Sequence, residues 1–172
     1  MRIEEDTKLD YKDVLIRPKR STLGSRKEVD LNRRFAFRNY DPAFEHENWK
    51  DFHYQGIPIM TANMDGVGTF EMAKELSRFG MFTCLVKTYS EEDIVEFFDT
   101  HQNLKECVAV SIGISDKDLI HFQAIYDRLH TDVKYVCIDV ANGYSERFVD
   151  FVRKFRNEFP HIVIIAGNVV TG

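Results

Sequence analysis

Five short apolar runs recur along the chain at a nearly constant interval, and this repeat constrains the fold more than any other feature. They span residues 57–62, 81–87, 107–113, 135–141 and 162–170, and they begin 24, 26, 28 and 27 residues apart. Each run is rich in Val, Ile, Cys or Phe, and most are continuous rather than alternating. Such runs are typical of strands that are buried on both faces, as in a parallel sheet.

Segments with helical periodicity separate the five runs. Three of them open on a serine followed by acidic residues, at Ser90, Ser115 and Ser145, and the first helical segment spans residues 69–79. Serine is a favoured N-cap, and acidic side chains in the first turn interact favourably with the helix dipole. Strands that alternate with helices at this period predict βαβ units with right-handed crossovers.

Two α/β architectures accommodate this alternation. One is a complete doubly wound, flavodoxin-like sheet with strand order 2-1-3-4-5. The other is a parallel (β/α)8 TIM barrel, which needs about 250 residues, so that this chain supplies an N-terminal extension, the first four β/α units and strand five. We favour the partial barrel, because no covering helix follows the fifth run in the sequence. Sequential strand order would confirm it.

The predicted division of the chain places an N-terminal arm and hairpin with a long loop in residues 1–56, and the first half of the barrel in residues 57–172. Within the first part, residues 13–18 are expected to form a short edge strand limited by Pro18, since proline cannot donate to a sheet. Residues 29–37 alternate and are expected to form a hairpin strand. Residues 39–56 are expected to form a long loop.

Composition and charge exclude several classes of protein. Residues 1–38 hold 11 Lys or Arg against 7 Asp or Glu, whereas the rest of the chain holds 12 against 21, so we expect no nucleic-acid partner. No apolar run approaches the length of a membrane span, and we predict no membrane partner and a cytoplasmic location. The six histidines lack zinc-site spacing, and no Cys-x-x-Cys occurs, so no metal site is predicted in this chain.

Polar or small residues follow every apolar run. Because ligands bind at the carboxyl ends of parallel strands, these residues are expected to line a common mouth. They are Asn63, Asp65, Lys87, Ser111, Asp139, Asn142 and Asn168. Each has a structural alternative: Asn142 begins an Asn-Gly turn, Asp139 could satisfy backbone amides, and Lys87 could simply be exposed. Gly66 and Gly68 match no phosphate-loop pattern, and are a weak signal.

Four segments resemble the IMP dehydrogenase/GMP reductase family, and within it the GMP reductases, of which the chain resembles the N-terminal half. They are residues 11–21 (YKDVLIRPKRS), 62–70 (ANMDGVGTF), 137–148 (CIDVANGYSERF) and 166–172 (AGNVVTG). The resemblance implies an oxidoreductase that carries out NADPH-dependent reductive deamination of GMP to IMP and ammonia through a Cys thioimidate. It also implies a homotetramer, and a potassium site in the part of the family barrel beyond residue 172.

The resemblance also assigns roles to particular residues. Those implied to contact NADPH are Ser25, Arg26, Lys87, Ser111, Gly113, Asp139, Val140 and Ala141, and those implied to contact the nucleotide are Ala62, Asn63 and Met64. Gly66 departs from the family pattern, which commonly has threonine there. No catalytic residue is expected in this chain, since Cys84, Cys107 and Cys137 do not match the family's nucleophile.

Two expectations about behaviour follow. Residues 1–172 alone should lack GMP reductase activity, and an open half barrel should self-associate or be poorly soluble, because its edge strands are unpaired. The alternative to an enzyme half is a non-enzymatic truncated product that binds nucleotide or associates with a full-length subunit. The sequence motifs are the same in both hypotheses.

Overall fold

The computed structural model describes residues 7, 9–37 and 53–170. The chain forms two compact units, Met1–Asp30 and Leu31–Gly172. The division predicted between residues 56 and 57 concerns where the barrel begins, and it stays a prediction.

The first unit contains two short 3-10 helices, η1 (Tyr11–Asp13) and η2 (Arg26–Glu28). The short strand predicted over residues 13–18 is wrong: residues 14–18 form no regular element. Leu15 and Ile16 are each 97% exposed, so no strand or core among the described residues covers them. An apolar run forms a strand only where a partner satisfies its backbone groups.

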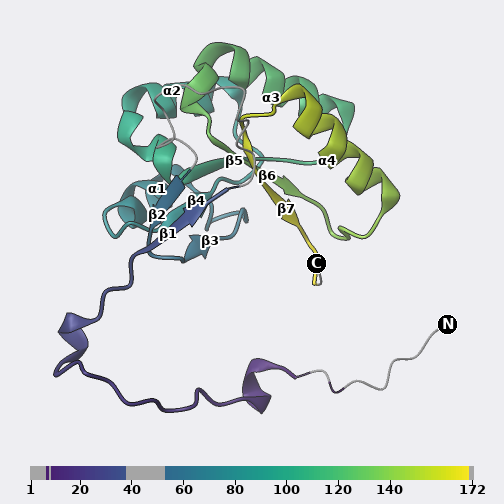
Figure 1. Ribbon diagram of the computed structural model, residues 1–172. Helices are drawn as coiled ribbons and strands as arrows, with labels where there is room; N and C mark the ends of the chain where they lie inside the picture. The colour runs from purple at the N-terminus through teal and green to yellow at the C-terminus, as the bar shows by residue number, and fades with distance from the viewer. Residues whose placement is uncertain (1–6, 8, 38–52, 171–172) are drawn as a thin grey trace. The chain divides into compact units, whose positions relative to one another are not determined.

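Five parallel strands form the sheet of the second unit, and they pair in the order of the sequence, β3-β4-β5-β6-β7. Their bounds are β3 (Met60–Thr61), β4 (Phe82–Cys84), β5 (Val108–Ile112), β6 (Tyr135–Asp139) and β7 (Val163–Gly167). Sequential order excludes the flavodoxin-like alternative and confirms the partial barrel. Figure 1 shows the helices gathered on one side of this sheet.

Four α-helices follow the first four strands of the sheet. They are α1 (Phe70–Ser77), α2 (Glu91–Thr100), α3 (Asp116–Leu129) and α4 (Glu146–Glu158). Each begins after a hydroxyl N-cap residue whose side chain accepts a backbone N–H of the first turn, as predicted for the three serines. In α2 and α3 an aspartate at the third helical position bonds back to the cap, which forms a capping box. Two 3-10 turns, η4 (Gln102–Glu106) and η5 (His130–Asp132), lead into β5 and β6.

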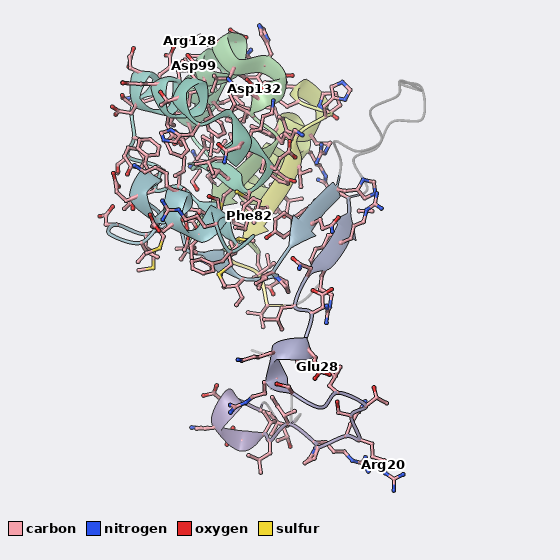
Figure 2. All side chains as sticks on the ribbon, turned by 90° about the vertical axis from the view of Figure 1, so that its left-hand side faces the viewer. Arg20, Glu28, Phe82, Asp99, Arg128 and Asp132 are labelled. Carbon is pink, nitrogen blue, oxygen red and sulfur yellow. The ribbon has the colours of Figure 1, made fainter. Side chains whose placement is uncertain are left out.

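The core lies between the central strands and the helices. Every residue of β5 is buried, and four of the five residues of β6 are, which explains why these runs are continuous in the sequence. Phe122, Phe155 and Phe159 interlock behind the sheet with ring centroids 4.7–5.0 Å apart. In Figure 2, Arg128, Asp99 and Asp132 lie among the helices, whereas Phe82 lies at the sheet. None of the described helices is both long and apolar enough to span a bilayer.

An antiparallel hairpin precedes the sheet. It pairs β1 (Arg33–Ala36) with β2 (His53–Gly56). The strand predicted near residues 29–37 is confirmed, but the loop predicted for residues 39–56 is wrong at its end, where β2 lies. The rest of that loop falls outside the described residues. β2 is held in place by Tyr54, which is 8% exposed and whose hydroxyl lies 2.8 Å from the Gly80 carbonyl oxygen. Gly80 lies 26 residues further along the chain, so no local sequence pattern predicts this contact.

Aromatic side chains close the amino ends of the strands against this hairpin. Phe82, the first residue of β4, packs edge-to-face with Tyr54 at 5.4 Å and with Tyr135, the first residue of β6, at 5.0 Å. Phe37 packs edge-to-face with Tyr135 at 6.1 Å. Beside them is an apolar cavity of about 240 Å³ that Ile59, Ile164 and other aliphatic side chains also line. The side chains that line the cavity at this end of the sheet are aromatic and aliphatic, and they pack against one another.

Candidate functional site

A hollow of about 180 Å³ lies where the strands end. The residues that line it come from β3, β4, β6 and β7 and the loops after them. They are Met60, Thr61, Ala62, Asn63, Cys84, Cys137, Ile138, Asp139, Ile165, Ala166, Gly167 and Asn168. The sequence-predicted residues Ala62, Asn63, Asp139 and Asn168 thus come together, because parallel strands end at one edge. Met64 is 64% exposed and does not line the hollow.

Backbone hydrogen bonds fix the position of Asp139 at the rim. Asp139 pairs with Gly167 in the β6–β7 register. Just beyond it, the Val140 N–H donates to the Gly167 carbonyl at 2.9 Å, and the Asn168 side-chain amide donates to the Val140 carbonyl at 2.9 Å. The two strand ends are thereby locked together, and the Asp139 side chain stays half-buried at the edge of the hollow. Val140 contributes only backbone groups to this link between the two strands, and Ala141 is exposed.

The Asn-Gly pair after β6 is a turn, as its structural alternative predicted. The side-chain oxygen of Asn142 accepts the Tyr144 N–H at 2.9 Å, which is the bond of an Asx turn. The Gly143 N–H donates to the Asn168 carbonyl at 2.9 Å. A side chain at Gly143 would meet that oxygen at 2.5 Å, so only glycine permits this approach of the two loops.

A second group gathers at the end of β5. Gly113 is buried, and a Cβ placed on it would lie 2.8 Å from the Asp118 carboxylate. Burial raises the pKa of Asp118, but hydrogen bonds from Ser115 and Gly113 and the positive charge of Lys87 together lower it below its ordinary value. Lys87 itself is exposed. Asp118 is thus the residue that links the predicted positions Lys87 and Gly113.

Sequence reasoning missed Asp118 as part of this end of the sheet. The signal was present as the Ser-x-x-Asp spacing from Ser115 to Asp118, which is typical of a capping box. The Ser115 N–H donates to Asp118 at 2.8 Å, and the Ser115 hydroxyl donates to the same oxygen. The spacing predicts the bond, but it does not reveal that the aspartate also receives the Gly113 N–H.

Two buried hydroxyl groups near the hollow lack a well-formed hydrogen bond within the described part of the chain. They are Thr61 Oγ1, on a residue that lines the hollow, and Ser111 Oγ, whose residue is 3% exposed and whose hydroxyl interacts with the Cys137 sulfur and helps to lower the pKa of that thiol. A buried hydroxyl without a partner has lost its water and gained nothing in return. Thr61 borders the hollow, but its hydroxyl oxygen is itself buried, and sequence reasoning had not singled this residue out.

The three cysteines differ in their surroundings. Burial raises the pKa of Cys107 to about 11. A hydrogen bond to Cys137, together with burial, raises the pKa of Cys84, and the same bond lowers the pKa of Cys137. All three residues are at most 9% exposed. Buried cysteines of this kind behave as small core residues, and they are poor nucleophiles for a bulky substrate.

Ser25 and Arg26 lie in the first compact unit. The Ser25 hydroxyl caps η2 by accepting the Lys27 N–H at 3.2 Å, and Gly24 donates to Glu28 at 3.1 Å. Arg26 is exposed. This capped turn holds its shape locally and presents the Arg26 guanidinium to solvent.

Comparisons with known proteins agree with this geometry. Residues 8–172 match the family described as IMP dehydrogenase / GMP reductase domain. The chain is 52% identical over 170 residues to GMP reductase 2 of Bos taurus and 51% identical over 171 residues to GMP reductase 1 of Homo sapiens. Each match covers 99% of this chain and 46% of the relative, so the chain spans about half the length of these relatives.

A solved structure shares the fold. It is the inosine 5' monophosphate dehydrogenase of Legionella pneumophila, with a TM-score of 0.57 and 26% sequence identity. The match covers 68% of this chain and 35% of that one. The partial parallel barrel is therefore the fold of a known group of enzymes.

Proposed function

Since the chain belongs to the IMP dehydrogenase/GMP reductase family, we propose that it supplies one wall of the active site of a GMP reductase, which reduces GMP to IMP and ammonia with NADPH. The observation that carries the proposal is the meeting of Ala62, Asn63 and Asp139 around one hollow at the carboxyl ends of the strands. In a barrel enzyme this is the end that holds the substrate.

The size of the hollow supports a shared site. Its volume of about 180 Å³ is below the roughly 300–1,000 Å³ of ordinary small-molecule pockets, so the described strands enclose part of a nucleotide. Asn63 offers polar groups to that part, and Ile165 and Ala166 offer apolar surface. A purine base needs both kinds of contact, since its edges hydrogen-bond and its faces are apolar.

The strand ends also suit a dinucleotide. When bound, NADPH supplies the hydride for the reduction. On the protein side, the half-buried Asp139 carboxylate can accept hydrogen bonds from hydroxyl groups, as acidic residues at strand ends do in other dinucleotide sites. The exposed ammonium of Lys87 can attract a phosphate. Arg26 belongs to the first compact unit, and the family resemblance implies that its guanidinium meets a phosphate of the NADPH bound to a neighbouring subunit. Ser111 and Gly113 are buried, and they position the strand end next to Asp118.

We further propose that residues 1–172 do not turn over GMP by themselves. The chemistry needs an accessible thiolate, and the environments of Cys84 and Cys107 disfavour one because their pKa values are raised. Cys137 is 9% exposed and is engaged with Cys84. The family resemblance implies a nucleophilic cysteine on a loop after a sixth strand, outside residues 1–172. The homotetramer, the potassium ion and the cytoplasmic location implied by the family belong to the same proposal.

The test is a pair of variants in the longer enzyme that carries this segment. Asp139→Ala should lower kcat/KM for NADPH by about 10-fold or more while changing GMP binding less, because it removes a cofactor contact. The control is Asp150→Ala, which removes a carboxylate that is 73% exposed on α4 and should change neither. An unchanged KM for NADPH together with an unchanged kcat in Asp139→Ala would overturn the assignment.

A further inference from the structure

Three sulfur atoms meet in the hollow. Cys84 Sγ lies 3.3 Å from Met60 Sδ, and the Cys84 thiol is hydrogen-bonded to Cys137. The three residues come from β4, β3 and β6, and all three line the hollow. Asp139 lines the same hollow, but among the described residues it does not form a metal-binding group with the two cysteines.

The cluster differs from ordinary core packing in two ways. Cys84 and Cys137 are 3% and 9% exposed, as core cysteines are, but Met60 is 50% exposed. The sulfurs also border an open hollow of about 180 Å³, which is large enough to admit an ion from solvent. Among the described residues, no three His, Cys, Asp or Glu side chains come together as a metal site, and it is the thioether of Met60 that supplies a third ligand here.

We propose that Met60, Cys84 and Cys137 form a binding site for a soft monovalent metal ion, with Cu(I) as the ion that fits best. Thiolate and thioether sulfurs are the donors that select Cu(I). With metal–sulfur bonds of about 2.3 Å, three sulfurs around one ion stand about 4 Å apart. Met60 needs to move about 0.7 Å away from Cys84, because the two sulfurs now lie 3.3 Å apart, and its exposed side chain has the space to do so.

Copper binding at this site conserves atoms and charge without any change of oxidation state. Both cysteines lose their thiol protons to solvent, Cu(I) forms two thiolate bonds and one thioether bond, and copper stays monovalent. The resulting centre carries a single negative charge, and the neutral thioether as third donor keeps that charge lower than a third thiolate would. The hydrogen bond between Cys84 and Cys137 already holds their two sulfur atoms close together, so these side chains need to move little when the ion binds.

The test is an anaerobic titration of the purified chain with Cu(I), kept reduced by ascorbate, against a chromogenic Cu(I) chelator. We expect one Cu(I) per chain. Cys84→Ser and Cys137→Ser should each weaken binding by at least about 100-fold, and Met60→Leu by about 10-fold. X-ray absorption should show three sulfur neighbours at about 2.3 Å in the unsubstituted chain.

Two matched controls keep the result interpretable. Cys107→Ser removes a buried cysteine outside the hollow, and Met64→Leu removes an exposed methionine at the same sheet edge, so neither should change affinity. Failure to compete with the chelator, or an equal loss in Cys107→Ser and Cys84→Ser, would overturn the proposal. The titration needs no nucleotide, so its outcome is separate from that of the GMP reductase proposal.

Discussion

The two ends of the parallel sheet differ in the burial and the polarity of their side chains. At the amino ends of the strands, Phe82 and Tyr135 are 5% and 1% exposed and pack edge-to-face beneath the β1–β2 hairpin. At the carboxyl ends, Asp139 is half-buried, and Asn168 is exposed, around an open hollow. A single strand such as β6 runs from one environment to the other within five residues. The difference is one of burial and polarity: aromatic packing stabilises the amino ends, whereas polar side chains border an open hollow at the carboxyl ends.

The largest expected effect is at the aromatic end. Phe82→Ala should lower the free energy of unfolding by about 3–5 kcal/mol, because it removes a buried ring and leaves a cavity between Tyr54 and Tyr135. Met64→Ala, an exposed position at the opposite end, should change it by less than about 0.5 kcal/mol. Urea unfolding followed by circular dichroism measures both. Equal losses in the two variants would remove the distinction between the ends.

The second effect tests whether close packing extends to the carboxyl end. Gly113→Ala should cost about 1–3 kcal/mol, because the new methyl group would lie 2.8 Å from the Asp118 carboxylate that caps α3. The comparison is Gly66→Ala, where no atom lies within 4 Å but φ is +73°. That change should cost about 1 kcal/mol from backbone strain alone. A Gly113→Ala chain as stable as the parent would show that Asp118 can move aside.

The third effect separates two buried tyrosines at the amino end. The Tyr54 hydroxyl lies 2.8 Å from the Gly80 carbonyl oxygen and 3.0 Å from that of Ile57, so Tyr54→Phe should cost about 1 kcal/mol. The Tyr135 hydroxyl has no hydrogen-bond partner within the described residues, so Tyr135→Phe should be neutral or slightly stabilising. Thermal unfolding of the two variants side by side decides this. A larger loss for Tyr135→Phe would contradict it.

The smallest effect is a pH dependence at the carboxyl end. Hydrogen bonds from Ser90 lower the pKa of Asp93, and those from Ser115 and Gly113, with Lys87, lower that of Asp118 against the effect of burial. A lowered folded-state pKa gives stability that is present above the unfolded value near 3.9 and is lost as the pH falls through the folded value. The melting temperature of Asp118→Asn should therefore fall less than that of the parent between about pH 5 and 3.

Asp93→Asn is the internal comparison for that measurement. Asp93 is exposed at the start of α2, so solvent screens its interactions, and its substitution should flatten the acid profile less than Asp118→Asn does. Parallel profiles for the parent and Asp118→Asn would show that the carboxylate contributes nothing to the folded state.

Most of the secondary structure could be predicted from the sequence, and the two wrong predictions have the same cause. The repeat of apolar runs predicted all five strands, and the cap residues Ser90, Ser115 and Ser145 predicted where three helices begin. The wrong predictions were the strand at residues 13–18 and the loop at residues 53–56. Both depend on partners distant in the sequence. Residues 14–18 have no strand partner among the described residues of their unit, whereas Tyr54 reaches Gly80 across 26 residues.

The candidate site was predictable in outline for a topological reason. Parallel strands end at one edge, so the residues after the apolar runs were predicted to line one mouth. Asn63, Asp139 and Asn168 line the hollow, whereas Asp65, Lys87, Ser111 and Asn142 do not. The roles of single residues were less accessible. Only the tertiary structure drew attention to Thr61 and Asp118. The unpartnered hydroxyl of Thr61 and the second hydrogen-bond donor to Asp118 depend on which residues surround them, and sequence spacing does not reveal this.

The sequence by itself determined the alternation of strands and helices, the N-caps and the family resemblance, because all three are written in local spacing and residue type. The tertiary structure decided the sequential strand order, the aromatic closure at one end and the meeting of Met60, Cys84 and Cys137 at the other. The physical reason is that local preference fixes what each segment becomes, whereas packing between distant segments fixes which side chains share a space.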